Sequence, residues 1–388
     1  MISITDKHNC CGCAACVQRC PKQCITMQED EEGFLYPQVN MDVCVDCGLC
    51  EKVCPELNIS TNDEPVKAFA AKNDDKAVRL SSSSGGVFTL LATKVIEAGG
   101  MVYGVKWDEK WQTVYSGAEH IEELETFRGA KYVKAKNDSV FCDVEKHLKA
   151  GREVLFSGLP CDVNALKLFL RKDYANLLTV ACVCHGVPSA SLWDKYLDEE
   201  CRNRKEYRKD IVAINLRDKR SGWRNYSCSL NFADGKTASL LHDDNPWMRA
   251  FIHNLTLRPS CHQCSSKLQN SMADITLGDF WGGQSLLDNS DDVLQDSGIS
   301  LVLIHSDKGE KTCINAGVTY IKEFGLSEVA KYNAAMIKSA SANPQREEFF
   351  ARVGSGESVI SATKRLTRAP LTLRVKIAVA KLLNSLHK

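Results

Sequence analysis

Two matching runs of cysteine constrain this chain more than any other feature of its sequence. The first run reads Cys10-x2-Cys13-x2-Cys16-x3-Cys20-Pro21, and the second reads Cys44-x2-Cys47-x2-Cys50-x3-Cys54-Pro55. Three thiolates at this spacing surround one face of a 4Fe-4S cube, while the fourth, turned away by the proline, ligates the other cube. We therefore predict two clusters, one bound by Cys10, Cys13, Cys16 and Cys54 and the other by Cys20, Cys44, Cys47 and Cys50.

The alternative for these runs is a pair of structural zinc sites, which also use C-x2-C pairs. Zinc needs four ligands per site and gives no reason for eight cysteines in two runs that each end in Cys-Pro. Residues 1–64 hold eleven Asp or Glu, four Lys or Arg and too little apolar material for a core of their own. Metal clusters commonly hold together a domain of this size. We expect Cys11 and Cys24, which lie outside the spacing, to be packing thiols.

Charge and composition narrow the function classes. The chain has 388 residues, with 49 basic and 49 acidic side chains and 19 cysteines. Because phosphate binding needs a basic surplus, we expect no nucleic-acid partner. The chain shows no N-terminal signal segment and no run near the roughly 18 apolar residues of a membrane span. We therefore expect a cytoplasmic protein, whose thiols stay reduced and serve metal or redox chemistry.

Beyond residue 64 the sequence predicts a larger mixed α/β domain over residues 65–345. Strand-like runs at 66–71, 101–106, 153–157, 177–183, 211–217, 273–277 and 299–305 alternate with helix-like stretches at 86–98, 139–150, 162–171, 189–202 and 245–255. Such alternation is typical of a layered α/β fold. The turn Asp234-Gly235 between the runs 226–232 and 237–241 predicts an inserted β-hairpin. The fold class is therefore α/β, preceded by a two-cluster ferredoxin-like α+β domain over residues 1–64.

Residues 346–388 form a basic C-terminal tail, in which no Asp or Glu follows Glu357. After Pro370, the apolar side chains fit an amphipathic helix, and they are Leu373, Ile377, Leu382 and Leu386. Such a helix either docks on an anionic membrane surface or an acidic partner, or packs on its own domain. In the first case the protein would sit at the inner membrane surface.

A second group of cysteines lies in the large domain. Cys161 is expected between a strand and a helix, Cys184 follows another strand, and Cys261-x2-Cys264 follows a proline turn. In an α/β sheet the carboxyl ends of strands converge on one crevice, where these four thiols would meet. They would then bind a third 4Fe-4S cluster. The alternatives are satisfied core thiols for Cys161 and Cys184, and zinc for the pair Cys261 and Cys264.

At these residues the chain resembles the family of beta subunits of coenzyme F-four-twenty hydrogenases and dehydrogenases. The resemblance covers roughly residues 66–325 and rests on an ordered set of segments: Ser83-Ser84-Gly85-Gly86, Gly129-Ala130-Lys131-Tyr132-Val133, Gly158-Leu159-Pro160-Cys161, Cys184-His185-Gly186-Val187-Pro188-Ser189, Arg217-Asp218-Lys219-x2-Gly222-Trp223, Cys261-x2-Cys264 and Ala273-Asp274-Ile275-x2-Gly278-Asp279-Phe280-Trp281-Gly282. It implies an α/β domain that binds FAD and a further 4Fe-4S cluster and exchanges hydride with a deazaflavin coenzyme. The form Cys184-His185-Gly186 resembles the bacterial branch, often encoded beside polysaccharide assembly genes, more than the methanogen proteins.

The expected flavin contacts follow no standard nucleotide motif, since the chain has neither G-x-G-x-x-G nor a P-loop. Ser83, Ser84, Gly85 and Gly86 precede a predicted helix and form either a phosphate cradle or an N-capping loop. A flavin that accepts hydride needs a positive charge near its N1–C2 edge. Lys131, Arg217 and Lys219 are candidates, with a solvated surface position as the alternative.

His185 and two tryptophans complete the candidate set. His185 adjoins a predicted cluster ligand and either shuttles protons or forms an ordinary hydrogen bond. Trp223 and Trp281 either stack on the flavin or pack in the core.

Together these features predict an iron–sulfur flavoprotein oxidoreductase. It would exchange hydride between FAD and a small organic substrate or a deazaflavin coenzyme, and relay single electrons through 4Fe-4S clusters to a redox partner protein. The alternative is an electron-relay or docking subunit of a larger redox complex, without an active site of its own. The substrate, the direction of electron flow and the oligomeric state stay open.

Overall fold

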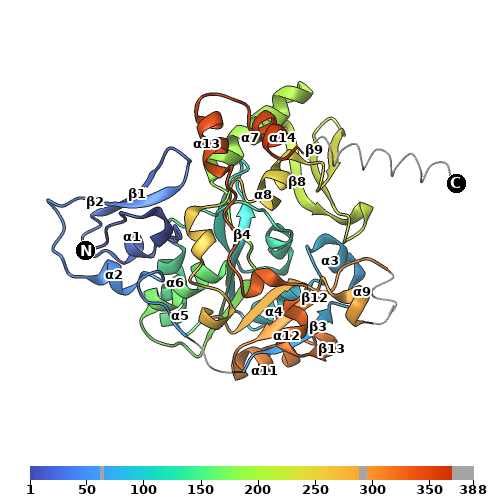
Figure 1. Ribbon diagram of the computed structural model, residues 1–388. Coiled ribbons are helices and arrows are strands. Elements are labelled where there is room, and N and C mark those ends of the chain that lie inside the picture. Colours follow the sequence, from blue (N-terminus) through green and yellow to red (C-terminus); the bar gives the residue numbers. More distant parts are fainter. Residues whose placement is uncertain (62–64, 288–294, 369–388) are drawn as a thin grey trace.

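An eight-stranded mixed sheet dominates the computed structural model, which describes residues 1–61, 65–287 and 295–368 (Figure 1). Its strands are β3 (Lys67–Lys72), β4 (Met101–Trp107), β5 (Thr113–Ala118), β6 (Val154–Gly158), β7 (Leu177–Cys182), β11 (Ile275–Asp279), β12 (Ser300–Ile304) and β13 (Thr319–Phe324). They are ordered β13-β3-β12-β11-β7-β6-β4-β5. The central strands β4, β6, β7 and β11 are parallel, so their carboxyl ends share one edge of the sheet.

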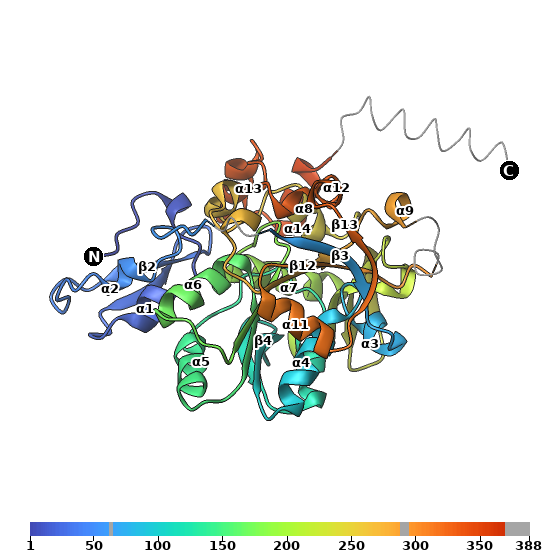
Figure 2. The ribbon, with the colours of Figure 1, turned by 90° about the horizontal axis from the view of Figure 1, so that it is seen from below.

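Helices cover both faces of this sheet because its central strands are apolar on both faces. Side chains of α5 (Val140–Lys149) and α6 (Pro160–Leu170) pack with Val154 and Phe156 of β6. On the other face, α4 (Val87–Glu97) and α11 (Asp307–Asn315) pack with Leu155 of the same strand. Figure 2 shows these two helix layers on opposite sides of β4. The alternation follows from the two-residue period of a strand and produces a layered α/β core.

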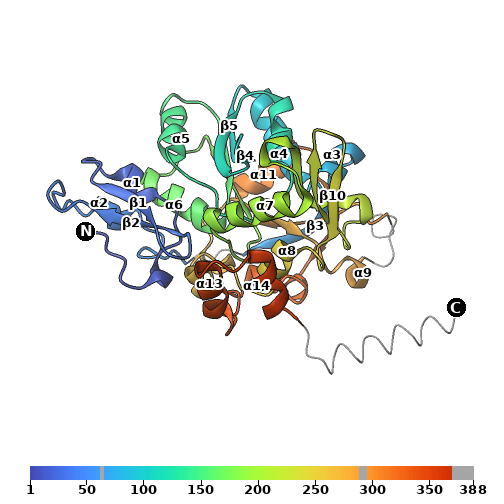
Figure 3. The same cartoon turned by 90° about the horizontal axis from the view of Figure 1, so that it is seen from above.

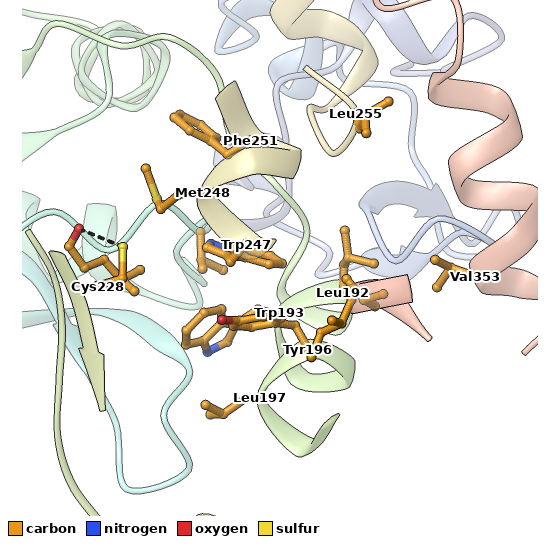
Figure 4. Close-up of a cluster of buried hydrophobic side chains, with 14 of the residues drawn as sticks. Leu192, Trp193, Tyr196, Leu197, Cys228, Trp247, Met248, Phe251, Leu255 and Val353 are labelled. Atoms are coloured by element: carbon orange, nitrogen blue, oxygen red, sulfur yellow. Dashed lines mark hydrogen bonds between the residues drawn. The ribbon is translucent and has the colours of Figure 1, made fainter. Parts of the chain in front are cut away.

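A second, three-stranded antiparallel sheet consists of β8 (Ile211–Asp218), β9 (Ser227–Phe232) and β10 (Thr237–Leu241). It packs with α7 (Ala190–Arg204), α8 (Pro246–Ile252), α13 (Arg346–Gly354) and α14 (Val359–Leu366). In Figure 4 the aromatic side chains of Trp193, Tyr196 and Trp247 meet at the centre of this cluster. The Trp193 and Trp247 rings are 5.0 Å apart. The predicted β-hairpin is confirmed as β9 and β10.

The ferredoxin-like domain consists of α1 (Ala15–Arg19), the hairpin β1 (Ile25–Glu29) and β2 (Leu35–Val39), and α2 (Leu49–Lys52). Its two cysteine runs share their local geometry: the residue before each helix has a left-handed backbone, with φ +59° at Ala14 and +70° at Gly48. The domain lies beside α6 in Figures 1 and 3. The Gln18 side chain of α1 donates to the Asn137 side chain of the large domain at 2.9 Å.

Shorter helices complete the large domain: α3 (Lys76–Ser81), α9 (Gly283–Leu286) and α12 (Leu326–Ala330). The first part of the predicted basic tail is packed rather than free. In α14, the backbone N–H groups of Val359 and Ile360 donate to Glu199 of α7. The amphipathic helix predicted after Pro370 lies outside the described residues. Within the described ranges, no helix has the length and apolar character needed to cross a bilayer.

Removing the central aromatic ring should destabilise the large domain. Trp247 is fully buried, so Trp247→Ala leaves a cavity and should lower the free energy of unfolding by about 3–5 kcal/mol. Urea unfolding followed by circular dichroism measures this loss. Tyr207→Ala is the matched control, because Tyr207 is 69% exposed and its loss should cost less than about 0.5 kcal/mol. Equal stability of the two variants would contradict the packing described.

Candidate functional site

The four cysteines predicted for the second ferredoxin cluster line one hollow. Cys20, Cys44, Cys47 and Cys50 surround about 340 Å³ of space, part of it open to solvent. The backbone N–H of Ile2 donates to the Cys50 sulfur at 3.3 Å, an interaction that favours a thiolate ligand. Cys24, expected to be a packing thiol, also lines this hollow, with its sulfur 3.3 Å from that of Cys20.

The cysteines predicted for the first ferredoxin cluster are also close to one another. Burial raises the pKa of Cys16 to about 12, and the neighbouring thiols of Cys10 and Cys54 contribute to this rise. The pKa of Cys13 is raised by burial and by Cys16. The structure therefore brings Cys10, Cys13, Cys16 and Cys54 into one electrostatic group, as the spacing predicts.

The four cysteines of the large domain meet in a pocket of about 690 Å³, part of it open to solvent, at the carboxyl edge of the parallel strands. Cys161 lies in the first turn of α6 directly after β6, and Cys184 lies two residues beyond β7. Cys261 lies within the 3-10 helix Pro259–Gln263, and Cys264 follows it. The pocket is thus assembled from three segments that are far apart in sequence.

These buried thiols need a positively charged partner to become thiolates. Burial raises the pKa of Cys184 well above its usual value, and burial raises that of Cys261 to about 12. At neutral pH both groups would therefore stay protonated unless a metal centre supplied the compensating charge. Among the residues that the structure describes, no three His, Cys, Asp or Glu side chains converge on a single-ion site. Thiolates on one zinc ion would lie about 3.8 Å apart, so the wider grouping suits a cluster better.

Two polar residues in the pocket wall fit an anionic cluster. Ser266 is 1% exposed, and its hydroxyl has no hydrogen-bond partner. The Lys267 ammonium donates to the carbonyls of Cys184 and Ala335 at 2.7 and 2.8 Å. A buried donor and a fixed positive charge beside the cysteines would both stabilise a negatively charged centre.

Three further residues in this pocket escape sequence reasoning. Cys11 of the ferredoxin domain forms a side-chain hydrogen bond with Cys161. Glu56, directly after Cys54-Pro55, accepts from the Ser265 hydroxyl at 2.7 Å. Cys182, at the end of β7, also lines the pocket. The ferredoxin domain therefore forms part of the pocket wall, a contact that no local sequence signal predicts.

A second group of candidate residues surrounds Arg217 at the end of β8. The Arg217 guanidinium donates to the carbonyl of Ser83 at 3.1 Å and to Asp279 at 3.0 Å. It lies over the rings of Tyr226 and Trp281, 4.1 and 5.2 Å from their centres. The structure thus gathers Ser83, Arg217 and Trp281, three of the residues expected to contact a flavin.

Trp223 joins this group through Asp279. Its indole N–H donates to the Asp279 carboxylate at 2.9 Å, and its ring stacks on that of Trp281 at 5.1 Å. Trp223 is buried, whereas Trp281 is 41% exposed. Of the two tryptophans, only Trp281 therefore offers a free aromatic surface to a ligand.

The serine-glycine loop before α4 is held to the protein by the groups that were expected to bind phosphate. The Ser84 hydroxyl donates to the carbonyl of Ile299 at 2.7 Å, and the Gly85 N–H donates to the Ser300 hydroxyl at 2.9 Å. Gly86 has φ +81° and caps α4. This geometry supports the capping alternative for Ser84, Gly85 and Gly86.

Lys219 and Lys131 bind backbone carbonyls rather than facing open space. Lys219 donates to the carbonyls of Arg79, Ser84 and Ser297. Lys131 donates to the carbonyls of residues 126, 127, 128 and 129, at the end of the 3-10 helix Ile121–Phe127. Burial lowers the pKa of each lysine to about 7. The expectation that they contact a flavin is therefore revised: their donors stabilise the fold.

His185 lies in the wall of the cysteine pocket. Its Nε2 is 2.6 Å from the side-chain oxygen of Asn254, and its ring meets Phe251 edge-on at 5.2 Å. Burial lowers the pKa of this histidine, so its ring is neutral at pH 7. The structural alternative, a hydrogen-bonded histidine, matches this geometry.

The capping role of Lys131 can be tested by substitution. Lys131→Met leaves buried carbonyls without their donor and should lower the free energy of unfolding by about 1–3 kcal/mol. The iron and flavin content of the folded protein should not change. Lys136→Met is the control, because Lys136 is exposed and nearby in sequence. Loss of flavin at unchanged stability would place Lys131 in the flavin site after all.

Comparison with known proteins gives a consistent family. Residues 9–57 match the 4Fe-4S dicluster domain, and residues 151–324 match the family described as the C terminus of the beta subunit of coenzyme F420 hydrogenase/dehydrogenase. One subunit of the F(420)H(2) dehydrogenase from Methanosarcina mazei is 25% identical over 294 residues, which are 69% of this chain and 75% of that protein.

Two further similarities concern a ferredoxin and a solved complex. The 7Fe ferredoxin of Hydrogenibacillus schlegelii is 42% identical over 65 residues, 16% of this chain and 77% of that protein. A chain of the F420-reducing NiFe hydrogenase complex from Methanosarcina barkeri aligns with a TM-score of 0.46 and 17% identity, over 73% of this chain and 97% of that chain. From the matches in sequence, the chain belongs to the iron–sulfur oxidoreductase family that contains the beta subunits of coenzyme F420 hydrogenases and dehydrogenases, with a two-cluster 4Fe-4S ferredoxin domain at its N-terminus.

Proposed function

We propose that this protein exchanges hydride between FAD and a small organic substrate or a deazaflavin coenzyme, and passes single electrons through three 4Fe-4S clusters to a partner protein. When bound, the flavin would convert a two-electron reaction into one-electron steps, which the clusters carry. The observation that carries the proposal is the position of the ferredoxin domain against the cysteine pocket, with Cys11 and Glu56 in the pocket wall.

The three cysteine sets follow one another across the domain interface. Cys11 reaches Cys161 in the pocket, and its neighbour Cys10 belongs to the first ferredoxin set. Cys16 of that set also senses the charge of Cys50 in the second set. This order supports a relay from the pocket, through the first ferredoxin site, to the second.

The Arg217 group lies beside the cysteine pocket because β11 and β7 are neighbouring parallel strands. The Val183 N–H donates to the Leu277 carbonyl at 2.8 Å, so the segment before Cys184 pairs with the segment before Asp279. Arg217 would supply the positive charge near a bound flavin, and Asp279 fixes its orientation. The half-exposed Trp281 would contact the flavin ring.

An electron-relay subunit without its own active site is the second candidate. Exposed apolar side chains of Met41, Val43 and Val45 surround the second ferredoxin site, which suits contact with another protein. The relative from Methanosarcina mazei is itself named as a subunit. The two candidates differ in whether the chain binds flavin.

Cofactor analysis separates the two candidates. Anaerobically purified protein should contain about twelve irons, four for each of three clusters, and about one FAD per chain. Iron and sulfide assays, with flavin released by acid and measured by fluorescence, give these ratios. About eight irons without flavin would reject the enzyme and favour the relay subunit.

Single cysteine variants assign the third cluster. Cys261→Ser and Cys264→Ser should each lose about four irons and keep the two ferredoxin clusters. Cys201→Ser is the control, because Cys201 is buried in α7 outside the pocket and should keep all iron. Unchanged iron content in both pocket variants would exclude this ligand set.

The flavin site can be tested at Arg217. Arg217→Met should reduce bound flavin at least about tenfold while iron is retained, because a buried charge-assisted contact contributes roughly 1.5–3 kcal/mol. Arg220→Met is the matched control, since Arg220 lies three residues away with a mostly exposed side chain. Equal flavin content in the two variants would exclude Arg217 from the site.

A further inference from the structure

Arg258 links the cysteine pocket to the ferredoxin domain. It directly precedes the 3-10 helix that carries Cys261. Its N–H donates to the Val187 carbonyl at 2.9 Å, and its carbonyl accepts from the Cys261 N–H at 2.9 Å. The backbone of Arg258 is therefore fixed in the wall of the pocket.

The side chain of Arg258 extends into the ferredoxin domain, where it contacts Cys10. Its Nε donates to the Cys10 carbonyl at 2.5 Å. Its Nη2 is 3.4 Å from the Cys10 sulfur and 2.9 Å from the Leu35 carbonyl. The ring of Tyr36 lies 4.2 Å from the guanidinium carbon. One arginine thus contacts a predicted cluster ligand and the strand beside it.

Gly12 permits this approach. The backbone at Gly12 has φ +70°, and a Cβ atom there would come within 2.9 Å of Arg258 Nη1. A larger residue at this position would push the guanidinium away from the cysteine loop. The loop and the arginine therefore fit one another closely.

The positive charge of Arg258 is buried without a carboxylate partner. The side chain is 1% exposed, and within the described ranges it forms no ion pair with an Asp or Glu. An unpaired buried charge is strongly unfavourable. The anion nearest to the guanidinium would be the Cys10 thiolate, which becomes a fixed negative charge when it ligates a cluster.

We propose that Arg258 is a positioning residue that pairs with the cluster-ligating thiolate of Cys10. This contact fixes the ferredoxin domain over the cysteine pocket and raises the reduction potential of the cluster nearest to that pocket. Reduction adds negative charge to a cluster, so a buried cation beside one ligand stabilises the reduced form more than the oxidised form. The inference rests on the proposed function, since it requires a cluster at Cys10.

Redox titrations of the full-length protein, followed by electron paramagnetic resonance, test this inference. In Arg258→Met, one cluster should become harder to reduce, with its ratio of reduced to oxidised form about tenfold lower at a fixed potential, which corresponds to about 59 mV. Arg258→Lys keeps a cation and should show a smaller shift. It also carries the test if the methionine variant fails to bind iron.

Arg346→Met is the matched control for domain docking. Arg346 also crosses the domain interface, where its guanidinium binds both carboxylate oxygens of Glu32 without contacting a cluster cysteine. Its cluster potentials should equal those of the wild type. Full iron with equal potentials in wild type, Arg258→Met and Arg258→Lys would overturn the inference alone. An equal shift in Arg346→Met would overturn it too, whereas a wild type that binds no iron would overturn the proposed function.

Discussion

The parallel direction of β6, β7 and β11 determines where the candidate site residues of the large domain lie. Each strand delivers its next residues to the same edge of the sheet, so Cys161, Cys184 and Asp279 become neighbours although they are far apart in sequence. The strands are apolar on both faces and buried by helices, which keeps their register fixed. The site therefore inherits its geometry from the core.

The interface between the ferredoxin domain and the large domain is polar and specific. Gln18 binds Asn137, and Arg19 forms a salt bridge with Glu145. Arg346 binds Glu32 in the loop between β1 and β2, and Arg258 reaches the first cysteine run. These contacts surround the place where the two sets of cysteines approach one another. A domain held only by apolar surface would lack such a fixed orientation.

Sequence reasoning succeeds where the pattern is local. The cysteine spacing predicts both ferredoxin sets, and the continuous apolar runs predict β6 and β7. It misses β5 and β13, because these edge strands are only partly buried and lack a clear apolar pattern. It also misses Cys11 and Glu56, whose partners lie in another domain. Lys131 and Lys219 show a related limit, since a segment marks a residue without revealing which way its side chain points.

Cys11 and Glu56 have a consequence for how the protein is assembled. They form one side of the cysteine pocket, yet they belong to a domain with too little apolar material to fold without its metal centres. The pocket therefore stays open on that side until the ferredoxin domain has acquired its iron. Maturation of the large domain is thus tied to maturation of the small one, and the two halves of the chain share a single order of construction.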